Sequence, residues 1–322
     1  MGPPAAQAGK GNSSPAHATK ARAKPKVDKK REATAMRTSP VPPRERTSPR
    51  AGPPPCMTPD PGFGDYTTWE KLPIGQMIAP KKGGVTKDGK FDVVIHFHGH
   101  EAVRKEFVKT ARGQVLVGID LGIGSGAYEK AFEAPAQFER LIGQVEASMA
   151  KRSGRERCQV RRIALSSWSA GYGAVWRILM QPAGRRIDSL ILLDSVHAGY
   201  LNGSRGQLKP YQLTPFVDYA RRAAKGDTFM FLSHSAIQPP GYASTREVAE
   251  NILRELGTTP RSAGPRRGDP LGLELYARFD RGNLHVRGYG GNDKPDHCAH
   301  LGLMADVLKV HLNPRWRTNG HR

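Results

Sequence analysis

Three kinds of feature are scarce in the 322-residue sequence: long apolar runs, cysteines, and large apolar side chains near the N-terminus. No run approaches the roughly 18 apolar residues of a membrane-spanning helix, and the first thirty residues contain no apolar signal-peptide core. The three cysteines are scattered and form no C-x-x-C pair, so neither a disulfide framework nor a cysteine zinc site is expected. By default, we predict a cytoplasmic protein with no membrane span.

Residues 1–55 contain no Phe, Trp, Tyr, Ile or Leu but hold 11 of the 26 prolines. Nothing in this segment offsets the entropy of ordering, so we expect residues 1–61 to be a disordered tail and residues 62–322 to form one domain. The tail carries twelve Lys or Arg residues against three acidic residues, and such a basic arm can bind polyanions. Because no aromatic residue interleaves these charges, we do not favour polyanion binding and keep it as an alternative.

Beyond residue 90 the sequence alternates between strand patterns and helix patterns. Strands are expected at residues 91–99, 114–121, 162–167, 187–194 and 228–233, followed by a hairpin-like pair at 273–279 and 284–289. Helices are expected at residues 101–110, 135–151, 171–180, 214–224, from Ser244 with a capping box to Glu247, and at 297–311. This alternation predicts an α/β fold, with a mostly parallel central sheet and helices on both faces.

The residues that can carry chemistry follow the strands, where an open parallel sheet binds its ligands. Ser169 lies in the sequence Ser-Trp-Ser-Ala-Gly, between a predicted strand and a predicted helix. A serine on such a turn exposes its hydroxyl at a helix N-terminus, and small neighbours allow the turn to close. Ala170 and Gly171 are small, whereas Ser167 replaces the first glycine of the G-x-S-x-G pattern. We predict Ser169 as a nucleophile; the alternative is a helix N-cap.

Histidines alternate at the end of the first predicted strand, at positions 96, 98 and 100. A His-Gly turn here can direct backbone N–H groups at a developing oxyanion, so we expect His100 or Glu101, together with Ala170, to form an oxyanion hole. Two alternatives stay open. Histidines at alternate strand positions share one face and can bind a metal, or they are core histidines with satisfied ring nitrogens. No carboxylate close in sequence supports a metal site, and we predict none.

A base for the serine must come from a loop near the same edge of the sheet. The sequence Asp296-His297-Cys298-Ala299-His300 follows the last predicted strand, whereas His285 lies inside a strand. Either His297 or His300 can serve, and we favour His297 because it lies closer to the loop. The alternative is that these histidines merely begin a helix.

A carboxylate must orient this base and stabilise the imidazolium that forms. Asp194 ends the strand expected at residues 187–194, whereas the strand at 228–233 ends without a carboxylate. We therefore predict Asp194 as the acid, with Asp293 and Asp296 as rivals. The alternative role of Asp194 is to cap the turn before His197.

The order Ser169, Asp194, His297, with a His-Gly turn upstream, resembles the α/β-hydrolase superfamily over about residues 90–312. The resemblance implies a sheet of about eight strands, a serine nucleophile, an acyl-enzyme intermediate and no cofactor. The sequence departs from the family pattern in two ways. Ser167 replaces the first glycine of the G-x-S-x-G pattern. The acid lies one strand earlier than in most members, an arrangement that some lipase-like members share.

These observations predict a serine hydrolase that cleaves an ester, in preference to an amide, of a small-molecule or polymer-derived substrate. The substrate loops are expected at residues 195–227 and 236–271, the two long segments between strands, with Trp168, Tyr200, Tyr211 and Tyr242 lining a pocket. The alternative function is a hydrolase-fold binding protein without turnover.

Overall fold

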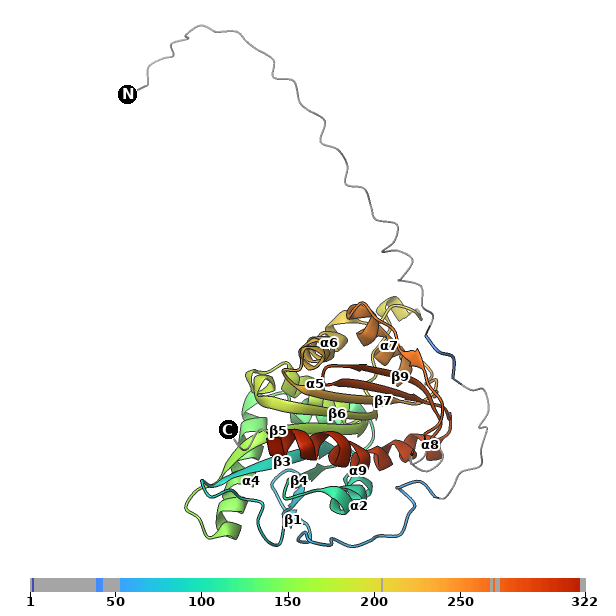
Figure 1. Ribbon diagram of the computed structural model, residues 1–322. Coiled ribbons are helices and arrows are strands. Elements are labelled where there is room, and N and C mark those ends of the chain that lie inside the picture. Colours follow the sequence, from blue (N-terminus) through green and yellow to red (C-terminus); the bar gives the residue numbers. More distant parts are fainter. Residues whose placement is uncertain are drawn as a thin grey trace, which may run out of the picture. The chain divides into compact units, whose positions relative to one another are not determined.

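Figure 1 shows the computed structural model, which describes residue 2 and residues 39–42, 53–203, 205–266, 269 and 273–318. The described residues from 39 onward lie in one compact unit, residues 37–322. Most of the predicted tail lies outside the described residues, so its disorder stays a prediction. Among the helices that are described, none is long and apolar enough to cross a membrane.

Strands of the described residues form one mixed sheet: β1 (Glu70–Lys71), β2 (Gln76–Ile78), β3 (Lys90–Phe97), β4 (Val115–Ile119), β5 (Gln159–Ser169), β6 (Ile187–Ser195), β7 (Phe229–His234), β8 (Arg261–Ser262), β9 (Leu275–Arg281) and β10 (Leu284–Tyr289). Their order is β1-β2-β4-β3-β5-β6-β7-β10-β9-β8. Neighbours from β4 to β10 pair in parallel, and the strands at both edges are antiparallel. The carboxyl ends of the parallel strands therefore share one edge, where a site can form.

Helices cover both faces of this sheet (Figure 1): α2 (His100–Thr110), α3 (Ser125–Ala131), α4 (Pro135–Ser153), α5 (Tyr172–Leu179), α6 (Pro210–Lys225), α7 (Thr245–Glu255), α8 (Lys294–Ala299), α9 (Leu303–Val307) and α10 (Asn313–Thr318), with short helical turns η1 (Pro182–Arg186), η2 (Leu201–Gly203), η3 (His300–Gly302) and η4 (Leu308–Leu312). Because strand side chains alternate, Val93 and Ile95 of β3 enter one core and Val94 enters the other. Helices α3 to α7 complete the first core, and α2 with the run from α8 to α10 completes the second.

All seven strands expected beyond residue 90 are present, and β9 and β10 form the expected antiparallel hairpin. The capping box between Ser244 and Glu247 also forms. The sequence does not predict β1, β2, β8 or α3, because these elements are too short to show a hydrophobic period. The last predicted helix begins earlier, at Lys294, and divides into several short helical segments. Strand order and helical layers are those of the α/β-hydrolase fold, so the predicted fold class is confirmed.

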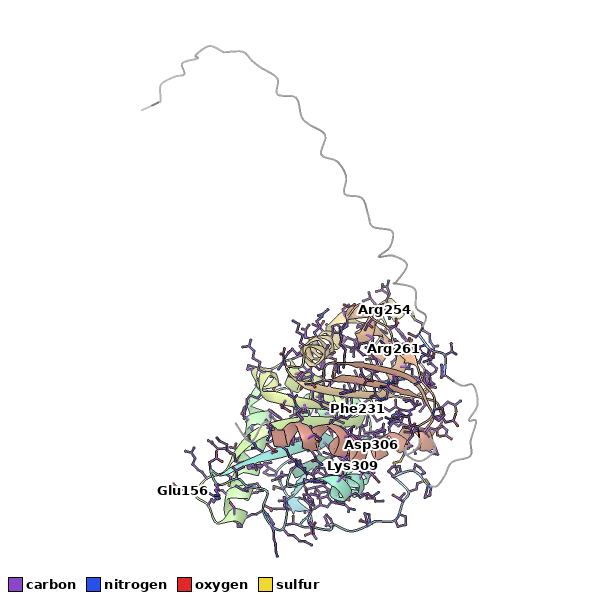
Figure 2. The ribbon with its side chains drawn as sticks, viewed as in Figure 1. Glu156, Phe231, Arg254, Arg261, Asp306 and Lys309 are labelled. Atoms are coloured by element: carbon purple, nitrogen blue, oxygen red, sulfur yellow. A yellow bond between two sulfur atoms is a disulfide. The ribbon has the colours of Figure 1, made fainter. Side chains whose placement is uncertain are left out.

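Cys56 and Cys298 form a disulfide between residues 242 positions apart, contrary to the expectation from cysteine spacing (Figure 2). The expectation failed because a single long-range pairing leaves no local spacing pattern. Cys158 is free and buried. Disulfides are rare in the reducing cytosol, and the cytoplasmic location expected by default stays a prediction.

The segment that begins at residue 53 lies against the domain, before the boundary predicted at residue 62. The guanidinium of Arg104, 1% exposed, donates to Asp60 Oδ2 (2.5 Å) and to the Gly62 carbonyl (2.6 Å). Lys105 Nζ donates to the carbonyl of Thr58 (2.6 Å). Polar groups of α2 thus contact residues that the composition assigned to the tail, and we propose that the folded domain starts before residue 62.

Truncation distinguishes these two boundaries. A chain that starts at residue 53 is expected to keep its melting temperature, whereas one that starts at residue 63 is expected to melt several degrees lower. The reason is that the shorter chain leaves Arg104 buried without two partners, and hydrogen bonds to charged groups contribute about 1.5–3 kcal/mol each. Circular dichroism measures the transition, and Cys56→Ser in the longer chain isolates the contribution of the disulfide. Equal melting temperatures for the two chains would support a folded domain that starts at residue 62.

Candidate active site

Ser169 is the last residue of β5, and α5 begins at Tyr172. Its φ of 47° lies in the left-handed region that residues other than glycine rarely adopt. A serine held in this conformation between a strand and a helix has the backbone geometry expected of a nucleophile elbow. The predicted strand-turn-helix context of Ser169 is therefore present.

The hydroxyl groups of Ser167 and Ser195 connect the turn to β6 through hydrogen bonds. Ser167, which stands where the G-x-S-x-G pattern has glycine, is fully buried, and its Oγ lies 2.9 Å from Ser195 Oγ in β6. Ser195 Oγ in turn donates to the carbonyl of Ser169 (2.9 Å). The departure from glycine thus gives a hydrogen-bonded link between β5, β6 and the backbone of Ser169.

Gly171 is the position at which the turn tolerates no side chain. A Cβ added there would lie 2.1 Å from the carbonyl oxygen of Phe97, which is backbone and cannot rotate away. We expect Gly171→Ala to destabilise the fold by at least about 1–3 kcal/mol, the usual range for overpacking. Urea unfolding measures this, with Gly143→Ala in α4 as the control because its added methyl group meets nothing within 4 Å. A Gly171→Ala protein as stable as the control would contradict this account of the turn.

His297 and Asp194 form the central pair of the site. His297 Nδ1 lies 2.6 Å from Asp194 Oδ2, and the Asp194 side chain is 1% exposed. Asp194 Oδ1 also accepts hydrogen bonds from the Ser235 N–H (2.8 Å) and from Thr245 Oγ1 (2.5 Å). Burial alone would raise the pKa of Asp194, but the nearby imidazole of His300 and the hydrogen bond from His297 hold it well below its usual range.

The ionised Asp194 fixes the tautomer of His297. A carboxylate only accepts hydrogen bonds, so Nδ1 of the ring carries the proton and Nε2 of the neutral ring is free to accept one. The His297 side chain is 19% exposed. No hydrogen bond joins it to the Ser169 hydroxyl in the described part of the chain, and such bonds are often long before substrate binds.

The rival residues have other partners. His300 is fully buried, its Nδ1 lies 2.8 Å from Ser233 Oγ, and burial lowers its pKa to about 4. Asp293 caps α8 by accepting the N–H of Asp296 (2.7 Å), and Asp296 completes this capping box. His297 lies inside α8, which begins at Lys294, whereas the sequence predicted a helix that begins at His297 itself. Both histidines lie near Asp194, but the hydrogen bond of Asp194 is with His297, whereas His300 bonds to Ser233.

The predicted His-Gly turn lies beside this pair. His98 and Gly99 both have positive φ, of 71° and 76°, and α2 begins at His100. N–H groups in the first turn of a helix have no partner within the helix, so those of His100 and Glu101 can serve a ligand. Their joint role with Ala170 as an oxyanion hole stays a prediction.

Asp120, which directly follows β4, organises this turn. Its carboxylate accepts the N–H of Gly99 (2.7 Å) and a hydrogen bond from His100 Nδ1. Burial would raise the pKa of Asp120, but the hydrogen bond and charge of His100 and the Gly99 N–H lower it to about 2. Asp120 was not among the predicted site residues, although it follows a predicted strand just as Asp194 does.

The alternating histidines do not share a metal centre. His96 is fully buried, with Nδ1 bonded to Ser166 Oγ (2.9 Å) and Nε2 to the His98 carbonyl (2.7 Å). His98 Nδ1 meets Tyr128 Oη (2.9 Å), while His100 faces Asp120. His98 Nδ1 also lies 3.5 Å from Asp120 Oδ1, and within the described part of the chain no group of three or more His, Cys, Asp or Glu side chains is placed to hold a metal ion.

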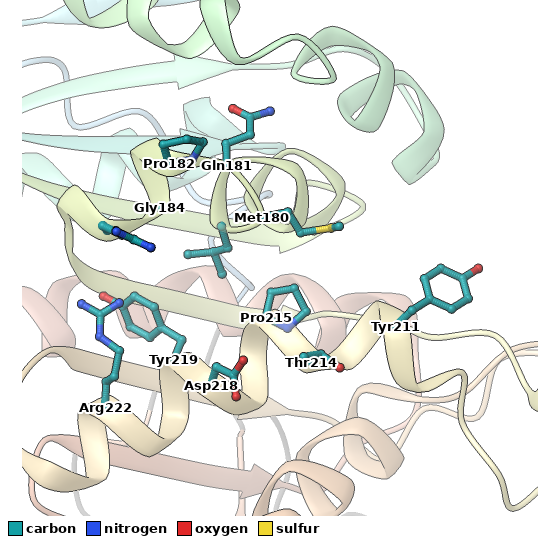
Figure 3. A pocket seen from close by; sticks show the side chains of 12 residues that line it. Met180, Gln181, Pro182, Gly184, Tyr211, Thr214, Pro215, Asp218, Tyr219 and Arg222 are labelled. Carbon is teal, nitrogen blue, oxygen red and sulfur yellow. The ribbon is translucent and has the colours of Figure 1, made fainter.

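The aromatic residues expected to line a pocket separate into different surroundings. Tyr200 is buried and donates to Glu247 (2.9 Å), whereas Tyr242 is half exposed and lies edge-on to His197. Figure 3 shows Tyr211 in a groove of about 760 Å³ between η1, α6 and the C-terminal end of α5. None of the candidate site residues lines this groove.

No family model and no curated protein matches the sequence. Among solved structures, the chain is similar to Est1E from Butyrivibrio proteoclasticus (11% identity, 79% of this chain and 100% of that one, TM-score 0.38) and to carboxyl esterase 2 from Tuber melanosporum (12%, 79% and 88%, 0.41). It is also similar to LpqC, a poly(3-hydroxybutyrate) depolymerase from Bordetella parapertussis (14%, 72% and 84%, 0.39).

Proposed function

We propose that this chain, whose sheet and helical layers are those of the α/β-hydrolase superfamily, is a serine hydrolase that cleaves carboxylic esters. The observation that carries the proposal is the 2.6 Å contact between His297 and the buried, ionised Asp194, at the same sheet edge as Ser169. Structural ion pairs also bury carboxylates, but this one orients a partly exposed imidazole whose second nitrogen is left to accept a proton.

The reaction proceeds through an acyl-enzyme. Ser169 Oγ bonds to the carbonyl carbon of the ester while its proton moves to His297 Nε2, and the imidazolium then gives that proton to the leaving alcohol. Water repeats the sequence at the acyl-enzyme and releases the carboxylic acid. Asp194 stays ionised throughout and stabilises the imidazolium.

Negative charge develops on the carbonyl oxygen in both steps. The N–H of Ala170 and those at the start of α2, from His100 and Glu101, are the donors proposed for it. Asp120 sets the geometry of the His-Gly turn by holding the Gly99 N–H and the His100 ring. The donors are thereby fixed before substrate arrives, which is what makes such stabilisation effective.

A fluorophosphonate probe separates a hydrolase from a binding protein that only shares the fold. The probe should label native protein stoichiometrically at Ser169, and heat-denatured protein should stay unlabelled. A panel of p-nitrophenyl esters of graded chain length then measures turnover and the preferred acyl length. Labelling at another serine, or no labelling with the fold intact, would reject the proposal.

A further inference from the structure

Trp168, the residue before Ser169, lies against two imidazole rings. Its indole stacks on His98 with 5.1 Å between ring centroids and on His297 with 4.6 Å, at interplanar angles of 12° and 28°. The indole Nε1 also donates to the backbone carbonyl of His297 (3.0 Å). One side chain therefore contacts both the ring and the backbone of the proposed base.

The neighbouring backbone leaves space for this indole. A Cβ added to Gly99 would lie 2.8 Å from the indole ring, so the glycine of the His-Gly turn is what allows Trp168 to occupy this place. Trp168 thus connects β5, the turn after β3 and helix α8. Because Trp168 directly precedes Ser169 in the chain, these contacts link the backbone next to the proposed nucleophile to the proposed base.

We propose that Trp168 is a positioning residue that holds His297 in place and stabilises the imidazolium formed when His297 takes the proton of Ser169. This inference rests on the proposed function, in which His297 is the base. The face of a tryptophan attracts a cation within about 6 Å of its ring centroid. A neutral imidazole gains little from this attraction, so the interaction strengthens as the proton arrives and lowers the barrier of that step.

Ionisable groups from several elements surround the His297 ring: Asp194, His98, His197, His300 and, on its own helix, Asp296. Burial lowers the pKa of each of the three histidines and so disfavours their charged forms. Asp194 meets the edge of the ring at Nδ1, and Trp168 covers its face. The two contacts are independent and can be removed separately.

Fluorescence tests the stack without any substrate. Contact with an imidazolium quenches indole emission more than contact with a neutral imidazole, so we expect the emission of the wild-type protein to fall in one step as the pH is lowered. Trp168→Phe and His297→Gln should each abolish the step. Trp69→Phe and His98→Gln should keep it; Trp69 is the matched control because it lies edge-on to a different histidine, His100.

Kinetics test the effect on the reaction. In Trp168→Leu we expect kcat on p-nitrophenyl acetate to fall about tenfold and the acidic limb of the kcat/KM profile to move by about half to one pH unit toward lower pH, because the imidazolium loses its stabilisation. Trp168→Phe keeps an aromatic face but lacks the Nε1 donor, so its acidic limb should stay in place while kcat falls. Trp176→Phe, whose ring lies against Tyr211, is the activity control.

The fluorescence and kinetic experiments together distinguish an error in the role of Trp168 from an error in the proposed function. An unmoved acidic limb with wild-type kcat in Trp168→Leu, or a fluorescence step that His98→Gln removes and His297→Gln leaves, overturns the role of Trp168. If Trp168→Leu does not fold, the fluorescence arm and the Trp168→Phe profile decide. A wild-type protein that shows the fluorescence step but hydrolyses no ester instead contradicts the proposed function and leaves the stack established.

Discussion

Replacing Ser169 with alanine is expected to lower kcat/KM on p-nitrophenyl esters by at least about 10⁴-fold, because no other group in the site forms the acyl-enzyme bond. The folded state should be little affected. The Ser169 hydroxyl makes no hydrogen bond within the described residues, so replacing it with alanine removes none of the contacts that hold the turn. Steady-state kinetics and a thermal melt on the same preparation measure both quantities.

Ser167→Ala is the matched control, since it removes a hydroxyl two residues away on the same strand. Ser167 donates into the chain that ends at the Ser169 carbonyl, so its loss should cost stability of about 1 kcal/mol and only a modest part of the activity. If Ser169→Ala keeps wild-type turnover, or if Ser167→Ala is the inactive variant, the nucleophile has been assigned to the wrong serine.

The sequence was sufficient for those features whose evidence lies within a dozen residues. The run from Phe91 to Phe97 is apolar at every position except Asp92 and His96, which is typical of a strand buried between two helical layers, and β3 is that strand. Ser169 combines a strand, small neighbours and a helix start within one short segment. Asp194 was predicted as the acid because it ends a predicted strand, where a parallel sheet places its site residues.

Contacts between distant segments left no such local evidence. The disulfide joins Cys56 to a residue 242 positions away, and Trp168 Nε1 reaches the carbonyl of a residue 129 positions away. Neither partner shows a pattern that distinguishes it from its neighbours in sequence. The boundary predicted at residue 62 rests on composition, which reflects the absence of apolar residues but not the ion pair between Asp60 and Arg104.

Replacing a member of the His297 and Asp194 pair is also expected to lower kcat strongly. His297→Ala is expected to lower kcat about as strongly as Ser169→Ala, because the two residues act as one unit in proton transfer. His300→Asn should keep most of kcat per folded molecule. The ring of His300 bonds to Ser233 and not to Ser169, and asparagine keeps a polar atom near the place of Nδ1. An inactive His300→Asn beside an active His297→Ala would move the base by three residues while leaving the fold unchanged.

Asp194→Asn tests the same pair from its other side. An amide in place of the carboxylate can donate to Nδ1, which leaves the proton on Nε2, the nitrogen that must accept the serine proton; kcat should therefore fall by about 10⁴-fold. Because Asp194 also accepts from Ser235 and Thr245, a loss of stability must be separated from this effect. Thr245→Val provides the control, since it removes one of those hydrogen bonds and leaves the tautomer of His297 unchanged. Near-wild-type kcat in Asp194→Asn would mean that another carboxylate orients the base, with Asp293 and Asp296 the next to replace.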